Sequence, residues 1–247
     1  MCGIYIIYVE RSEKMLNIKG YFKYIIFGII SFLLLILLRN IYAIKFDIEE
    51  LLKIILLDFG DFEKLGLEKF TLPYIAAFLI ILCFICNYVS FQFVKINNTY
   101  YIARFSFKQH YIMYVLKNIM AEIFIFLLIW FVIIIGYLYS VFHTVSIHLF
   151  ISCLLNIFKM GILIYIIHII YILIILMEKK KNLGISLLLL FLIFCVDILL
   201  ETHFLTMSSR LNITLIYLFI ELVVLLLLSY TIINYYTKKK EIGEYYD

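Results

Sequence analysis

Four ionisable side chains interrupt long apolar runs of this sequence, where a charge is costly and marks a candidate for function: Lys159, Asp197, Glu221 and Glu122. Lys159 lies about 11 residues after the start of its run, and Glu221 about 9 residues after the start of its own. At helical rise these positions are roughly 16 and 14 Å deep. Depths this similar predict that the ammonium and the carboxylate can form an ion pair inside the protein.

Two interpretations of the Lys159–Glu221 pair stay open from the sequence. In the first, Lys159, Glu221 and Asp197 line a translocation path for a substrate. In the second, the pair joins two helices and contacts no substrate. Asp197 and Glu122 lie near the ends of their runs, where we expect their carboxylates to reach water.

A second candidate is the polar and basic segment 97–118, which separates two very apolar blocks. On a helix, Arg104, Lys108 and Tyr111 would share one face, because residues three and four positions apart are neighbours on a helix surface. That face could bind anionic lipid headgroups, or it could contact a soluble partner protein. Periodicity alone favours the lipid interpretation.

The elements that must position these residues are helices in a membrane. Of the 247 residues, 66% are hydrophobic and 15% are charged, whereas about a quarter of a soluble domain is charged. The apolar runs are continuous, exceed the roughly 18 residues that indicate a transmembrane helix, and are about twice as long as a barrel strand. Gly161 predicts a bend in one of them. The sequence therefore predicts an all-α membrane protein with six transmembrane helices, at about 21–39, 72–94, 119–142, 149–177, 183–200 and 212–234.

The distribution of lysine and arginine predicts the orientation. With six spans, both termini fall on one side, together with the segment 97–118. Leaving aside Arg39 and Lys159, that side carries fourteen Lys and Arg residues and the other side five. Positive residues concentrate in cytoplasmic loops, so the more positive side is predicted to be the cytoplasmic one. Because the positive residues are spread among several loops and form no single basic surface, no nucleic-acid partner is expected. We expect a multi-pass protein of the cell membrane, with a cytoplasmic N-terminal segment at 1–20, a six-helix domain at 21–237 and a cytoplasmic tail at 238–247.

The longest predicted outer connection, 40–71, is acidic, with seven Asp and Glu residues against four lysines. Such an acidic segment could sense or bind a ligand outside the cell. Six of its apolar residues recur at helical spacing and predict an amphipathic helix on the membrane surface; they are Ile48, Leu51, Leu52, Ile55, Leu56 and Phe59.

Other residue patterns favour packing over chemistry. Cys83 and Cys86 have CxxC spacing, but they lie inside a predicted span, without the surroundings of a redox site. His168 is predicted to hydrogen-bond between helices. The histidines near the predicted outer face match no compact metal site, so no metal is expected. The sequence also lacks the glycine-rich phosphate loop of ATPases, so no cofactor is expected in this chain.

Residues 100–111, YYIARFSFKQHY, carry a Tyr, a hydrophobic residue, an Arg, a Ser and a further basic residue before an aromatic. This segment resembles the loop between the second and third spans of small ABC-2-type transporter permeases. The likeness is greatest to those of low-GC Gram-positive bacteria associated with peptide or bacteriocin export and immunity. The six-span layout, the cytoplasmic termini and the long first outer connection are similar to that family as well.

The resemblance implies a coupling helix between the second and third spans that docks in a groove of a separate ABC ATPase subunit. Arg104, Ser106, Lys108 and Tyr111 would then be the docking residues. It further implies a second permease chain, in a homo- or heterodimer, and an exported peptide or other amphipathic compound. ATP would be used by the partner subunit, and this chain would not be an enzyme.

Two alternatives to a transport subunit remain from the sequence. One is a non-transporting immunity or sensor protein that acts through its acidic outer segment. The other is an intramembrane enzyme that uses Glu201, His203 or Asp197.

Overall fold

The apolar runs of the sequence form helices in the computed structural model. It describes residues 21–37, 47–57, 72–96, 108–178, 184–200, 202–206, 208 and 211–238. Within these residues the regular structure is helical, without strands. The helices are Tyr21–Leu37, α2 (Ile48–Ile55), α4 (Leu72–Ile96), α6 (Lys108–Phe142), α7 (Ile147–Glu178), α8 (Gly184–Leu200) and α9 (Leu211–Lys238).

Three of the helices contain segments long and apolar enough to cross a membrane: Met113–Phe142, Ile147–Ile174 and Leu211–Thr231. Three shorter apolar helices, at Tyr21–Leu37, Ile75–Ser90 and Gly184–Leu200, accompany them. The predicted all-α class is therefore confirmed for the described residues, and three of their helices have the length and composition of membrane spans.

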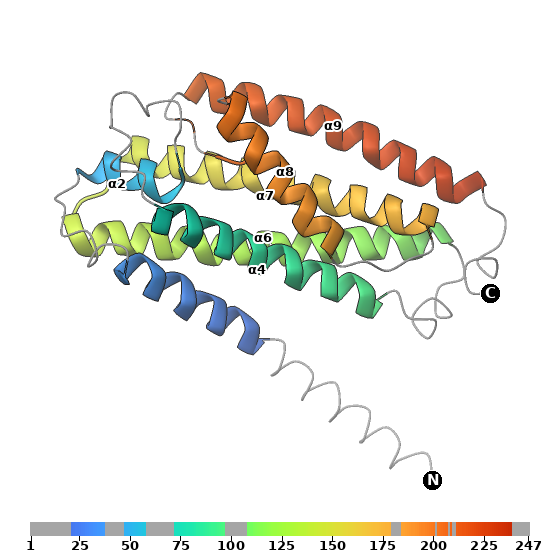
Figure 1. Cartoon of the computed structure of the whole chain (residues 1–247), viewed down its shortest axis with the longest axis horizontal. Helices are drawn as coiled ribbons and strands as arrows, with labels where there is room; N and C mark the ends of the chain where they lie inside the picture. The colour runs from blue at the N-terminus through green and yellow to red at the C-terminus, as the bar shows by residue number, and fades with distance from the viewer. Residues whose placement is uncertain are drawn as a thin grey trace, which may run out of the picture.

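The apolar helices run in alternating directions between two ends of the molecule (Figure 1). One end holds the start of α6 and the last turn of α9; we call it the Lys108 end. The opposite end holds α2 and the turn between α6 and α7; we call it the α2 end. Alternation of this kind follows from short connections, such as the one between α6 and α7, which returns the chain beside itself.

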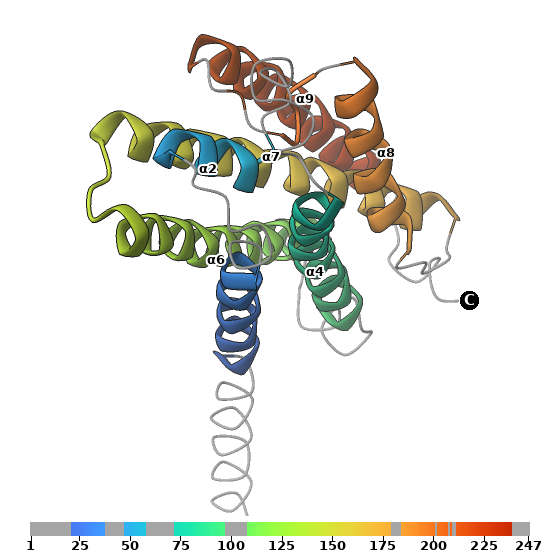
Figure 2. The ribbon, with the colours of Figure 1, turned by 60° about the vertical axis from the view of Figure 1, so that its left-hand side comes forward.

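Helix α7 occupies the centre of the bundle, between α6 and α9, and α8 crosses it at an angle (Figure 2). In α7, 72% of the apolar segment is buried within the protein, against 11% in α9. The outer face of α9 is apolar and exposed, as at Phe219, Leu226 and Leu227. This is the pattern of a helix that faces lipid on one side, because hydrocarbon does not penalise exposed leucine.

The structure adds detail to two local expectations. Helix α2, predicted as an amphipathic helix on the membrane surface, packs against α4 and α6, and its apolar side chains from Leu51 to Ile55 are buried. At Gly161, where a bend was predicted, α7 continues as helix. A Cβ atom at Gly161 would lie 2.8 Å from Leu127 Cδ1. The glycine therefore marks a close approach of α7 to α6.

Candidate functional site

A buried group of polar residues fills the space between α7, α8, α9 and the connection that follows α8. We call it the loop cluster and the connection, residues 202–206 and 208, the inserted loop. Every member is at most 7% exposed, although α7, α8 and α9 are otherwise strongly apolar. The cluster consists of Asn156, Lys159, Asp197, His203, Thr206, Ser208, Thr214 and Glu221.

Asp197, near the end of α8, holds the inserted loop through four hydrogen bonds. Its Oδ1 accepts from the Thr202 hydroxyl at 2.7 Å and from the Phe204 N–H at 3.1 Å. Its Oδ2 accepts from the Leu205 N–H at 2.6 Å and from the Thr206 N–H at 3.0 Å.

Lys159, on α7, binds the same loop from the other side. Its ammonium donates to the His203 carbonyl oxygen and, at 2.5 Å, to the Thr206 carbonyl oxygen. The inserted loop thus gives its N–H groups to an anion and its carbonyl groups to a cation. This arrangement satisfies backbone that would otherwise be very unfavourable in a membrane, where irregular chain is tolerated only when it is buried in protein.

Asn156 fixes the far end of the inserted loop on α7. Its side-chain oxygen accepts from the Ser208 N–H at 3.2 Å, and its amide donates to the Ser208 carbonyl at 3.4 Å. The Thr214 hydroxyl of α9 donates to the same carbonyl at 3.3 Å. Asn156 lies nine residues after Ile147, so the loop reaches roughly 13 Å along α7.

Glu221, on α9, completes the cluster in a different way. It is 2% exposed, and neither carboxyl oxygen has a hydrogen-bond partner within the described part of the chain. The charges of Lys159 and Asp197 both act on it. The cluster therefore combines a cation and an anion bound to the loop with a carboxyl group bound to neither.

The structure brings together the three residues predicted for a translocation path, but it changes their contacts. Lys159 and Glu221 lie in one cluster, as their depths predicted. Lys159 bonds to loop carbonyls, however, and Glu221 accepts no hydrogen bond from the described residues. Asp197 was expected to reach water, and this was wrong: it is fully buried, because the inserted loop covers it. Asn156 and Ser152 were missed, although they lie three and seven positions before Lys159, a spacing that indicates a polar face on α7.

The predicted docking residues divide between the described chain and the rest. Arg104 and Ser106 lie outside the described residues. Lys108 and Tyr111 are at the start of α6, which continues from them to Phe142 without interruption. The third apolar helix was predicted to begin at about residue 119, so α6 extends further toward the basic segment than its apolar run.

A second buried polar contact joins α4, α7 and α8. His168 Nδ1 lies 2.7 Å from the Ile164 carbonyl oxygen, and Nε2 lies 3.2 Å from both the Ser90 hydroxyl oxygen and the Cys86 carbonyl oxygen. The Ser90 and Ser186 hydroxyl oxygens are 2.7 Å apart. The predicted interhelical hydrogen bond of His168 is confirmed. All three side chains are fully buried, so this group links the three helices within the protein interior.

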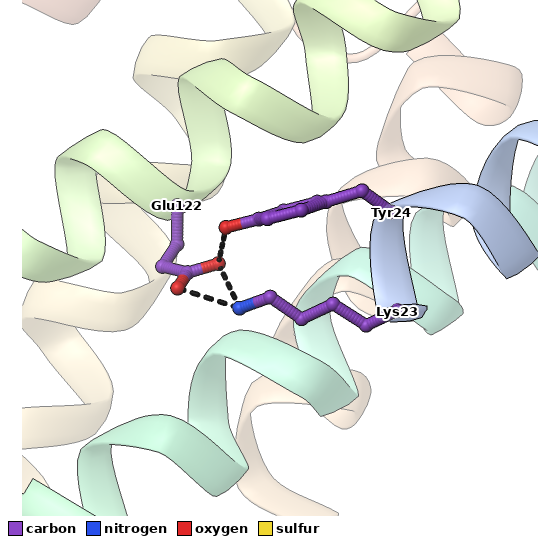
Figure 3. A network of polar contacts seen from close by, with 3 residues as sticks. All are labelled: Lys23, Tyr24 and Glu122. Atoms are coloured by element: carbon purple, nitrogen blue, oxygen red, sulfur yellow. Dashed lines mark hydrogen bonds and ion pairs between the residues drawn. The ribbon is translucent and has the colours of Figure 1, made fainter. Parts of the chain in front are cut away.

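An ion pair ties the first helix to α6 (Figure 3). The Lys23 ammonium is 2.6 Å from both carboxylate oxygens of Glu122, and the Tyr24 hydroxyl donates to the same carboxylate at 2.7 Å. The ammonium also lies 4.5 Å and 4.7 Å from the ring centres of Tyr24 and Tyr88. The Glu122 side chain keeps 21% of its surface exposed, in line with its expected contact with water.

Comparisons with protein-family models, with curated proteins and with solved structures found no match for this chain.

Proposed function

We propose that this chain is the membrane-spanning subunit of an ABC exporter, which moves a peptide or another amphipathic compound and is driven by a separate ATPase. The observation that supports this most is the continuity of α6. Two residues of the segment that resembles a permease coupling loop, Lys108 and Tyr111, belong to the same helix that crosses the bundle.

The length of α6 suits the transmission of a movement. Its 35 residues extend about 52 Å, whereas the hydrocarbon core of a bilayer is about 30 Å thick. The excess falls at the Lys108 end, where the sequence is polar and basic. Helix α6 also packs along α7, which carries Asn156 and Lys159. A push on Lys108 by a partner would therefore reach the helix that holds the inserted loop, because a helix moves as a rigid rod.

The proposal includes six membrane crossings with both termini in the cytoplasm, in the cell membrane. Two such chains would enclose the path and two ATPase chains would drive it. The alternating helix directions in Figure 1 suit this arrangement. An amphipathic substrate suits an interior whose fixed charges, Lys159 and Asp197, are already engaged with the inserted loop.

Co-purification with an ATPase tests this function. The tagged chain is expressed in its native host, solubilised and captured, and the ATPase activity of the eluate is measured. We expect activity with the natural chain and its loss with Arg104→Glu, which reverses the charge of the docking segment. Lys180→Glu is the matched control, because it makes the same charge change in another predicted cytoplasmic turn.

Two results would overturn the proposal. One is an eluate without ATPase activity from cells in which the chain is functional. The other is equal loss with both variants, which would assign the effect to net charge. Function without an ATPase would favour the immunity or sensor alternative.

A further inference from the structure

The charges of the loop cluster balance without Glu221. Lys159 contributes one positive charge and Asp197 one negative charge, and both are hydrogen-bonded to the inserted loop. An ionised Glu221 would leave a net negative charge in a buried site. It would also lack a hydrogen-bond donor among the described residues, since neither of its oxygens has a partner there. A buried, unbonded carboxylate is so unfavourable that the group binds a proton instead.

We propose that Glu221 is a proton-binding site, and that release of its proton transfers Lys159 from the carbonyls of the inserted loop to Glu221. The protonated state is the one described here, with the loop held on both sides. Loss of the proton creates a carboxylate within the field of the Lys159 ammonium. The ion pair that the two residues can then form takes the cation away from His203 and Thr206 and loosens the loop.

A proton fits this site better than a metal ion. The Lys159 ammonium already occupies the two loop carbonyls, and it would repel a second cation. Among the described residues, no group of three or more His, Cys, Asp or Glu side chains could hold a metal. A proton needs only the carboxyl oxygen itself. The step is balanced: the Glu221 O–H bond breaks, the proton leaves to solvent, and no electron is transferred.

The ionisable groups near Glu221 decide which side chain would bind and release the proton. Lys159 on α7 and Asp197 on α8 are both hydrogen-bonded to the loop, and Tyr217 on α9 is a phenol. His203 lies in the loop, with its ring centre 5.9 Å from that of Tyr217. Helix α6, which also packs on α9, has no acidic or basic side chain after Glu122 and before its end, only the phenols Tyr137 and Tyr139. Among these described groups, His203 is the one that competes with Glu221, and the experiment must separate the two.

Accessibility of the inserted loop is measured with Ser208→Cys and a membrane-impermeant maleimide, over a range of pH, on the purified chain in lipid nanodiscs. Ser208 is 3% exposed, so labelling requires the loop to open. Thr144→Cys, on the exposed turn between α6 and α7, is the matched control that cancels the thiolate reactivity common to both sites. Labelling of the native cysteines is subtracted using the unsubstituted chain.

We expect the ratio of Ser208→Cys to Thr144→Cys labelling to be low at acid pH and to rise by up to roughly tenfold per pH unit until it levels off, as a single proton requires. With Glu221→Gln, which mimics the protonated form, the ratio should be low and flat. With Lys159→Met it should be high and flat, since the loop has lost its cation.

Three results would overturn the proposal. A flat ratio in the chain with Glu221 would show that the proton does not control the loop. A rise that survives Glu221→Gln would assign the titration to His203. A ratio that follows sodium concentration at fixed pH would replace the proton by a metal ion. Infrared spectroscopy of the same sample gives an independent readout, because the carbonyl band of a protonated carboxyl should disappear in Glu221→Gln. Proton binding at Glu221 involves this chain alone, so a negative result here would not contradict the proposed ATPase partner.

Discussion

Asp197→Asn should weaken the hold of α8 on the inserted loop more than its small change in size would indicate. The substitution keeps the shape of the side chain but replaces one acceptor oxygen by an NH₂ group. Both carboxylate oxygens of Asp197 accept from backbone N–H groups, Phe204 at one and Leu205 and Thr206 at the other. Whichever way the amide is turned, its NH₂ faces at least one backbone N–H.

The magnitude follows from counting the affected bonds. One buried N–H without an acceptor costs about 1–3 kcal/mol. The remaining bonds lose their ionic character, and hydrogen bonds to a charged group are roughly twice as strong as neutral ones. Together these effects predict that Asp197→Asn lowers the free energy of unfolding by about 3–5 kcal/mol. Thr202→Val is the control, because it removes a single hydroxyl bond to Asp197 and should cost about 1 kcal/mol.

Unfolding can be followed in detergent through the reaction of Cys86 and Cys153 with a thiol dye, since both side chains are fully buried in the folded chain. The unfolding free energy of each variant is obtained by titration with a denaturing detergent. If Asp197→Asn costs no more than Thr202→Val, the four-bond description of Asp197 is wrong.

Two further predictions concern an ion pair and a helix cap. Lys23→Met should cost about 3 kcal/mol of unfolding free energy, because it leaves the Glu122 carboxylate without its cation. Adding Glu122→Leu to Lys23→Met should recover most of that loss, and equal stability of the single and double variants would refute this. Ser146→Ala should cost about 1 kcal/mol of unfolding free energy, because the Ser146 hydroxyl accepts a hydrogen bond from the Leu149 N–H at the start of α7. Ser146→Asp should keep this stability, because aspartate can accept the same bond. Equal losses in the two variants, measured by the same titration, would contradict the capping role.

Much of the helical framework could be predicted from the sequence, because hydropathy reports directly which segments are apolar enough for a membrane. The apolar runs at 149–177 and 183–200 became α7 and α8 with ends within two residues. The start of α6 was missed by about eleven residues, since Lys108 to Asn118 is polar. Hydropathy cannot detect a helix that continues beyond its apolar part, because backbone hydrogen bonding does not depend on it.

The loop cluster was predictable only in part. Helical rise gave Lys159 and Glu221 similar depths, and the structure places them in one cluster. The contacts of Lys159 were not predictable, because its acceptors are the backbone carbonyls of His203 and Thr206. Every residue has a backbone carbonyl, so the residue types do not show which carbonyl will be an acceptor. Polar residues such as Thr202 and Thr206 predicted an ordinary loop, and only their bonds to Asp197 show that the chain turns inward.

The hydrogen bonds between Lys159 and the inserted loop have a consequence for synthesis of the protein. The acceptor carbonyls of His203 and Thr206 follow Lys159 by 44 and 47 residues. At about 5–20 residues per second, the ribosome adds them roughly 2–9 s after Lys159. During that interval α7 is a nascent helix whose central ammonium group lacks these two acceptors. We therefore expect stable insertion of α7 to require α8 and the loop, so that the second half of the chain enters the membrane as one unit.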